Sequence, residues 1–310
     1  MTAEARLRTP SSLTLGLSNL GRSTTVGSVE ERGAIDFAEL TLASGHTYVD
    51  TSSNYAGGRS EAVLGAAATR LGPTRSADII TKVDVDPVTG RFDRDRVWRS
   101  FDESRARLGI DTIPLLHLHD PDMLSMSEAL GPGGAVQGLV ELRDSGAVGA
   151  IGVAGGPIPM MSAYVSSGVF DAVLCHNRFT LVDQSATALF EDARRRGMVV
   201  FNAAPFGAGL LAAGPRQDAR YAYLPASAEL LTWTRALELL CREHDLSLPA
   251  VALAFSLQSS LIDSTVVGIS SPRRLDELDE LQRQTVPSEL WAKIEQLGPA
   301  PTPIVDPPAR

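Results

Sequence analysis

The chain has 310 residues, of which 44% are hydrophobic, so it is long enough to bury a sizeable core. Its formal net charge of −9 argues against nucleic acid as a partner, because phosphate binding needs a basic face. No apolar run reaches the length of a bilayer span, the N-terminal segment lacks the apolar core of a secretion signal, and Cys175 and Cys241 have no metal-binding or disulfide-framework spacing. We therefore expect a cytoplasmic protein with no membrane partner and no metal site.

Short apolar runs rich in β-branched residues alternate with amphipathic segments of helical period along the chain. The predicted strands are residues 13–17, 47–50, 78–83, 113–118, 148–153, 171–174, 198–203 and 263–267. The predicted helices are residues 30–44, 59–71, 93–108, 135–145, 183–196, 228–244, 249–258, 272–282 and 287–297. A proline-rich tail from about residue 298 is expected to be extended or disordered.

Eight strands that alternate with helices predict a parallel sheet covered on its faces. An open doubly wound sheet and a closed barrel both satisfy this pattern. Two observations favour the barrel: no Gly-x-Gly-x-x-Gly opens a helix after the first strand, and polar residues stand at the C-terminal ends of several strands. We therefore predict an α/β fold, an eight-stranded parallel β/α (TIM) barrel that forms one domain over residues 1–310.

Four polar residues at three of these strand ends are the candidate catalytic group: Asp50, Tyr55, Lys82 and His119. Tyr55 is the candidate acid/base, but a free phenol has a pKa near 10, too high for ready proton exchange at neutral pH. A nearby ammonium favours the phenolate, so we expect Lys82 to lower the pKa of Tyr55. Asp50 would keep Lys82 charged and oriented, and His119 would hydrogen-bond a substrate oxygen.

Each of these residues also has a purely structural interpretation. Asp50 would cap a loop, Lys82 would be a solvated strand end, and Tyr55 would pack in a loop. The functional interpretation depends on the set, because chance rarely places all four at successive strand ends. We expect His117 to be a core or lining residue that faces away from His119.

Eight segments carry a resemblance to a known family: VDTSSNYAGGRSEAVLG, IITKV, SFDESRARLGID, LLHLHDPD, GAVGAIGV, NRFTLVD, PFGAGLL and VVGISSPRRLDEL. In order and spacing they resemble the aldo-keto reductases over nearly the whole chain. The resemblance implies a barrel, a nicotinamide cofactor and hydride transfer to or from a carbonyl carbon. The family's tetrad falls on the four residues named above, with the phenol of Tyr55 as proton donor in reduction or its phenolate as base in oxidation.

Within the family, the chain is most similar to the bacterial D-threo-aldose (L-fucose) 1-dehydrogenase and pyridoxal 4-dehydrogenase group. The segments LHDPD, NRFTLVDQ and AAPFGAGLLA carry this finer resemblance. It implies a small-molecule substrate, a sugar or pyridoxal-type hemiacetal that is oxidised to a lactone.

The resemblance also implies a cofactor site, and we expect it to comprise His176, Asn177, Pro205, Phe206, Gly207, Gly209, Gly268, Ser270, Ser271, Arg274 and Glu277. Backbone N–H groups of the glycine loop and of the last barrel helix would bind phosphate. Arg274 aligns with the position that binds a 2′-phosphate, which favours NADP while leaving NAD possible.

The nicotinamide end departs from the family pattern. Ala154 and Gly155 stand where relatives commonly have Ser-Asn, His176 stands where they have Gln, and Ala203 replaces a stacking aromatic residue. An aromatic contact contributes roughly 0.5–1.5 kcal/mol, so its loss would weaken cofactor binding without abolishing it.

Three functions remain open from the sequence. The first is the hemiacetal dehydrogenase, and the second is an NADPH-dependent reductase of a secondary-metabolite ketone or aldehyde. The third, of another class, is a cofactor-binding regulatory barrel with vestigial activity, which the altered nicotinamide end motivates and the intact tetrad opposes. The sequence predicts neither the direction of the reaction nor the oligomeric state.

Overall fold

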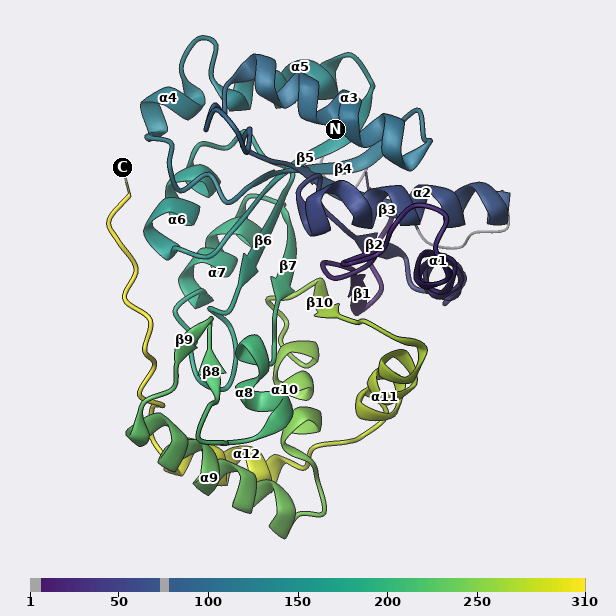
Figure 1. Cartoon of the computed structure of the whole chain (residues 1–310). Coiled ribbons are helices and arrows are strands. Elements are labelled where there is room, and N and C mark those ends of the chain that lie inside the picture. Colours follow the sequence, from purple (N-terminus) through teal and green to yellow (C-terminus); the bar gives the residue numbers. More distant parts are fainter. Residues whose placement is uncertain (1–6, 73–77, 310) are drawn as a thin grey trace.

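Eight strands close into a parallel barrel in the computed structural model, which describes residues 7–72 and 78–309 (Figure 1). Around the ring they are β1 (Leu13–Gly16), β10 (Ser264–Gly268), β7 (Val199–Ala203), β6 (Ala172–His176), β5 (Val148–Gly155), β4 (Ile113–His119), β3 (Asp78–Val83) and β2 (Tyr48–Asp50). Parallel pairing of β1 with β10 closes the ring, and a buried hydrogen bond between Thr14 Oγ1 and Ser264 Oγ (2.8 Å) reinforces that seam. The predicted barrel is confirmed.

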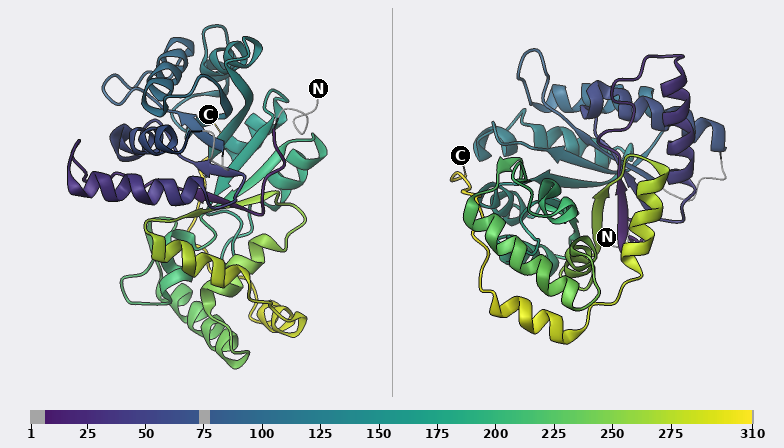
Figure 2. Two further views of the ribbon diagram at one scale, coloured as in Figure 1. Left: turned by 90° about the vertical axis from the view of Figure 1, so that its right-hand side faces the viewer. Right: turned by 60° about the horizontal axis from the view of Figure 1, so that its bottom comes forward.

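Helices form an outer ring around the strands, and α9 (green) and α12 (yellow) lie side by side within it (Figure 2). The helices are α1 (Val29–Leu42), α2 (Arg59–Leu71), α3 (Arg94–Leu108), α4 (Met126–Leu130), α5 (Ala135–Asp144), α6 (Ile158–Ser166), α7 (Thr187–Arg195), α8 (Leu210–Ala213), α9 (Ala228–Glu243), α10 (Leu248–Leu257), α11 (Pro272–Gln282) and α12 (Ser288–Gln296). Short 3-10 turns η2 (Tyr55–Gly58) and η4 (Gly207–Gly209) follow β2 and β7, and β8 (Arg220–Tyr221) pairs with β9 (Leu224–Pro225) in a small hairpin. Among the described residues, no helix has the length and apolarity needed to cross a bilayer.

Local sequence explains where helices begin and end. The carboxylate of Asp93 accepts a hydrogen bond from the backbone N–H of Arg96, which satisfies a free donor at the start of α3. That helix ends at Gly109, whose φ of 64° is readily adopted only without a β-carbon. Ser28 and Ser247 cap α1 and α10 in the same way as Asp93 caps α3.

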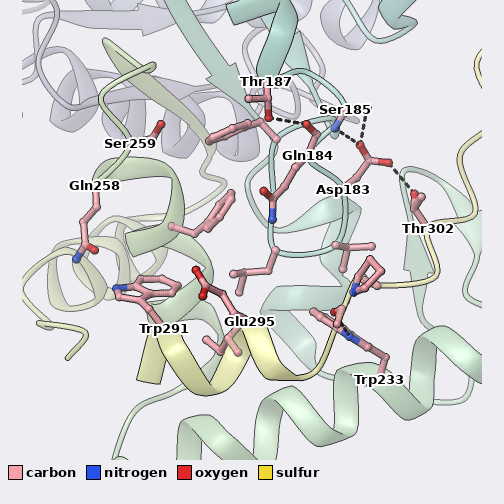
Figure 3. Close-up of a pocket in the computed structure, with 18 of the residues that line it drawn as sticks. Asp183, Gln184, Ser185, Thr187, Trp233, Gln258, Ser259, Trp291, Glu295 and Thr302 are labelled. Carbon is pink, nitrogen blue, oxygen red and sulfur yellow. Dashed lines mark hydrogen bonds between the residues drawn. The ribbon is translucent and has the colours of Figure 1, made fainter. Parts of the chain in front are cut away.

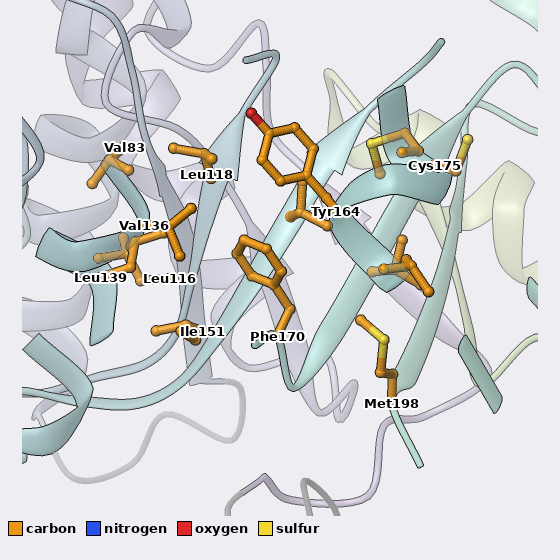
Figure 4. Close-up of a cluster of buried hydrophobic side chains, with 14 of the residues drawn as sticks. Val83, Leu116, Leu118, Val136, Leu139, Ile151, Tyr164, Phe170, Cys175 and Met198 are labelled. Carbon is orange, nitrogen blue, oxygen red and sulfur yellow. The ribbon is translucent and has the colours of Figure 1, made fainter. Parts of the chain in front are cut away.

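Two apolar layers hold the barrel together. Outside the strands, Leu116 and Ile151 pack against helical residues such as Leu139 and Tyr164 (Figure 4). Inside the ring, side chains that include Tyr48 and Phe201 fill the space, so the barrel is a packed core without a pore. The chemistry is therefore confined to the C-terminal ends of the strands.

The proline-rich tail is extended and tied to the barrel, so the alternative of disorder is not what the structure shows. Asp306 forms an ion pair with Arg178 (Nη2–Oδ1, 2.5 Å) and accepts a hydrogen bond from the backbone N–H of Ile158 (2.8 Å) at the start of α6. Thr302 donates to Asp183 (2.7 Å). The tail, drawn in yellow, thus runs past the β8–β9 hairpin to α6 (Figure 1).

Candidate active site

Lys82 and Asp50 form a buried ion pair at the ends of two adjacent strands, β3 and β2. Lys82 Nζ lies 2.8 and 2.7 Å from the two carboxylate oxygens of Asp50 and 2.7 Å from the carbonyl oxygen of Thr51. Only 1% of the Lys82 side chain and 5% of the Asp50 side chain are exposed. Burial opposes the charge of Lys82, but the carboxylate outweighs it and raises the pKa of the ammonium above its ordinary value.

Tyr55 begins the turn after β2, and the Lys82 ammonium lies 4.7 Å from the centre of its ring. Burial raises the pKa of the Tyr55 phenol to about 12, although the charge of Lys82 acts in the opposite direction. Lys82 therefore acts on this pKa in the expected direction, but burial has the larger effect, and the net pKa lies above the ordinary value. A pKa of about 12 corresponds to a neutral phenol near pH 7.

His119 completes the predicted group from the end of β4. Its ring contacts the Tyr55 ring edge to face, with the centroids 5.6 Å apart. Its Nδ1 atom lies 2.6 Å from Oδ1 of Asp84. Burial disfavours a charged imidazole, but the Asp84 carboxylate outweighs burial and raises the pKa of His119. The structure therefore brings all four predicted catalytic residues to one end of the barrel.

Asp84 is a buried carboxylate that the sequence analysis did not single out. It follows β3 directly, and its Oδ2 atom accepts hydrogen bonds from the hydroxyls of Ser52 and Ser53 (2.8 Å for Ser53) and from the backbone N–H of Asn54 (3.1 Å). Burial raises its pKa, but His119 and these hydrogen bonds prevail, so the pKa lies below its usual value. The carboxylate thus links His119 to the loop that leads to Tyr55.

Asp120 and His176 form a second polar pair at the barrel mouth. Asp120 Oδ1 lies 3.4 Å from Nε2 of His176, and Asp120 Oδ2 lies 3.5 Å from Nε2 of His119. Burial would raise the pKa of Asp120, but the hydrogen bond from His176 and the charge of His119 lower it to about 2. Asn177 donates from Nδ2 to Nδ1 of His176 (3.1 Å), which directs the N–H of His176 toward Asp120.

The ring of His176 occupies space that a side chain at Gly156 would need. A β-carbon at Gly156 would lie 2.8 Å from that ring. His176 therefore packs closely against Gly156 and pairs with Asp120.

His117 lies inside the barrel, and the expectation that it faces away from His119 is wrong. Residues two apart on a strand share a face, and the His117 ring contacts Phe201 in the interior with the centroids 6.1 Å apart. The side chain is fully buried, and burial holds its pKa well below the ordinary value. It is a core residue, as predicted.

Several predicted cofactor residues line one cavity of about 530 Å³, namely Phe206, Gly268, Ser270, Arg274 and Glu277. Arg274 lies at the mouth of this cavity, where it pairs with Glu277 (2.8 Å). Ser271 caps α11 and lines an adjacent cavity of about 280 Å³. Guanidinium, hydroxyl and helix N-terminal N–H groups are the donors that a phosphorylated adenosine requires, so this end fits a dinucleotide.

The remaining loop residues have other surroundings. Pro205 and Gly207 are buried, and neither they nor Gly209 line the cavity with Phe206. A β-carbon on Gly207 would lie 2.2 Å from the Tyr221 ring, so packing requires glycine there. Within the described residues, no cluster of three or more His, Cys, Asp or Glu side chains is placed to hold a metal ion.

Figure 3 shows a larger cavity, of about 890 Å³. Trp233 and Trp291 line it, and Asp183, bonded to Ser185 and Thr302, borders it beside the tail. None of the four candidate catalytic residues contributes to it. This cavity is thus separate from the candidate chemistry.

Comparison with known proteins confirms the resemblance. A model described as the aldo/keto reductase family matches residues 12–298. D-threo-aldose 1-dehydrogenase from Pseudomonas sp is 32% identical over 97% of this chain and 98% of that enzyme. Pyridoxal 4-dehydrogenase from Microbacterium luteolum is 30% identical over 67% of this chain and 63% of that enzyme. An aldo-keto reductase from Bacillus halodurans, solved in its holo form, superposes with a TM-score of 0.76 at 20% identity, over 94% of this chain and 93% of that one.

Proposed function

The chain belongs to the aldo-keto reductase family of NAD(P)-dependent oxidoreductases, and from this premise we propose that it oxidises the hemiacetal carbon of a sugar. The observation that carries the proposal is the contact between Tyr55 and the buried Lys82–Asp50 pair. A phenol beside a fixed ammonium can exchange a proton with a substrate oxygen, because the ammonium stabilises the phenolate that results.

The proposed roles follow from these positions. In oxidation the phenolate of Tyr55 accepts the proton of the substrate hydroxyl, and in reduction the phenol returns it. Lys82 stabilises the phenolate, Asp50 holds Lys82 in place, and His119 donates a hydrogen bond to the same oxygen. The nicotinamide, when bound, supplies the acceptor or donor of hydride.

The residues that would hold the adenosine end of the cofactor are Ser270, Arg274 and Glu277. The guanidinium of Arg274, at a cavity edge, suits a 2′-phosphate, so we propose NADP as the preferred form. His176 and Asn177 would lie near the nicotinamide end, where the family's usual amide-binding residues are absent.

Three observations support a sugar as the substrate. The carboxylate of Asp120, held by the N–H of His176, offers acceptor positions at the mouth for substrate hydroxyl groups. The ionised Asp120 also disfavours anionic substrates. The aldose dehydrogenase aligns over nearly all of both chains, whereas the pyridoxal enzyme aligns over about two thirds, so we favour the sugar.

The test is reduction of NADP⁺ or NAD⁺, followed at 340 nm, with a panel of neutral aldoses and with pyridoxal. The Tyr55→Phe variant should lose about 10²–10⁴-fold in kcat and retain cofactor affinity, because it lacks the proton carrier. Tyr223→Phe is the matched control, since that side chain is exposed and stands between β8 and β9, outside the four candidate catalytic residues. Turnover by Tyr55→Phe close to that of the unmodified enzyme would remove the assignment.

A second candidate is an NADPH-dependent carbonyl reductase. The raised pKa of Tyr55 favours it, because a neutral phenol is the form that reduction consumes. Consumption of NADPH with simple aldehydes, without any signal from aldoses and NADP⁺, would select this reading. The regulatory barrel is not retained, since the family and the named relatives are oxidoreductases.

A further inference from the structure

We propose that Asp84 is a positioning residue for the reaction. Its carboxylate holds the His119 ring with a hydrogen on Nδ1 and directs the Nε2–H group at the substrate oxygen, an inference that rests on the proposed function. Asp84 lies outside the segments that carry the family resemblance. Its role is proposed from its contacts in this structure alone.

The hydrogen-bond count at Asp84 identifies it as an ionised acceptor. Three donors converge on Oδ2: the hydroxyls of Ser52 and Ser53 and the backbone N–H of Asn54. The other oxygen, Oδ1, faces Nδ1 of His119 at 2.6 Å. A carboxylate has no hydrogen to give, so the hydrogen in this contact belongs to Nδ1 of His119.

With Nδ1 bound to Asp84, the other ring nitrogen of His119, Nε2, is the one that can face a substrate. Nε2 faces the barrel mouth, where Asp120 Oδ2 lies 3.5 Å away. Two carboxylates on opposite sides of one imidazole favour a hydrogen on both nitrogens, that is, the imidazolium form. The opposing influences are burial and the ammonium of Lys82.

The remaining charged groups near His119 act through neighbours. His176 pairs with Asp120 and shares its carboxylate, and His117 lies one step deeper on the same strand and stays neutral. Lys82 is already neutralised by Asp50. Among the charged groups around His119, Asp84 therefore has the largest influence on its proton, with burial acting in the opposite direction.

Asp84 also sets where Tyr55 stands relative to His119. Ser52, Ser53 and Asn54 form the loop between β2 and Tyr55, and all three are bound to the same carboxylate that holds His119. One buried anion therefore fixes the two groups that would contact the substrate oxygen. A role in folding alone would predict no effect on the titration of His119.

The first experiment measures His119 by NMR of ring-¹⁵N-labelled histidine in the full chain without substrate. The chain has five histidines, so a His119→Gln variant assigns the signal. We expect hydrogen on Nδ1 at neutral pH and a titration midpoint above the usual value near 6.5. An Nδ1 atom without hydrogen in the unmodified protein would overturn the proposal, and this result does not depend on any variant's folding.

The second experiment compares Asp84→Asn with Asp122→Asn, which removes a neighbouring mouth carboxylate that does not contact His119. The asparagine retains the shape and acceptor of Asp84 but not its charge. We expect the His119 midpoint to fall by at least one pH unit in Asp84→Asn, and the falling limb of kcat/KM for carbonyl reduction to move by the same amount. Equal shifts in both variants, or none in Asp84→Asn, would overturn the proposal.

These readouts separate the two hypotheses. If no aldose is oxidised but the Asp84-dependent shift is present, the proposed substrate is wrong and the positioning role stands. If aldoses are oxidised and the shift is absent, the proposed substrate stands and the positioning role of Asp84 is wrong.

Discussion

Removing the ammonium of Lys82 should destabilise the fold by a predictable amount. In Lys82→Met the Asp50 carboxylate, 5% exposed, would lose the group that binds both of its oxygens. Removing one partner of a buried ion pair leaves the other charge unpaired and lowers the free energy of unfolding by about 3–5 kcal/mol, whereas replacing both partners with neutral groups lowers it far less. For a chain of this size that cost corresponds to a fall in Tm of about 5–8 °C.

The assay is thermal and denaturant unfolding of four proteins: unmodified, Lys82→Met, Asp50→Asn and the double variant. We expect the double variant to be more stable than the sum of the single effects predicts, with a coupling of roughly 1–3 kcal/mol. The chain offers an internal control, because Lys293 is its other lysine and is partly exposed beside Glu289 at 3.5 Å. Lys293→Met should change stability by at most about 1 kcal/mol. Additive single effects, within about 0.5 kcal/mol, would refute the reasoning.

Three further outcomes are expected. Because the pKa of Tyr55 is about 12, kcat/KM for oxidation should rise about tenfold per pH unit from 7 to 10, whereas kcat/KM for reduction should show no rise and should fall where His119 loses its proton; a matching rise in both directions, followed at 340 nm, would contradict this. Arg274→Ala should raise the Kd of NADP, measured by fluorescence, at least tenfold more than that of NAD, and equal effects would mean that Arg274 does not meet the 2′-phosphate. Asp306→Asn should lower Tm at pH 7 by about 2–5 °C through loss of the Arg178 contact. The Asp306 pKa is depressed in the fold, so this stabilisation exists above the unfolded value near 3.9 and the difference should shrink as pH falls below it; a constant difference would exclude the ion pair as its source.

The barrel and the tetrad were predictable because both follow from strand periodicity. Strand ends of a parallel barrel meet at one rim, so polar residues at successive strand ends must approach one another, as Asp50, Lys82 and His119 do. Helix α6 was not predicted. Its N-cap residue is Pro157, its first turn contains Pro159 and its residues are apolar on most sides, so neither a polar cap nor an amphipathic period indicates a helix.

Asp84 was out of reach for a different reason. An aspartate just after a strand is a common loop residue, and its partner His119 is 35 residues away in the chain. Lys82 pairs with His117 across the two strands, so positions two residues further on, Asp84 and His119, face each other. That relation becomes visible only when the register is known.

The pKa of Tyr55 illustrates a further limit. The sequence places an ammonium near the phenol, which lowers the pKa, but it does not show how deeply the ring is buried. Burial has the larger effect here and reverses the sign of the expected shift. Competing contributions of similar size can be ranked only from the packed structure.

The seam between β1 and β10 joins two parts of the chain that have different proposed roles. The four proposed catalytic residues all precede residue 120, whereas the cavity proposed for the adenosine end is built mainly after residue 205. The two halves are joined where Thr14 meets Ser264, at a separation of 250 residues. Almost the whole chain must therefore be synthesised before the residues proposed for proton transfer and those proposed for cofactor selection can come together. If these assignments are right, we expect that exchanging the C-terminal third with that of a relative of different cofactor preference would change which dinucleotide binds and leave Asp50, Tyr55, Lys82 and His119 with their present contacts.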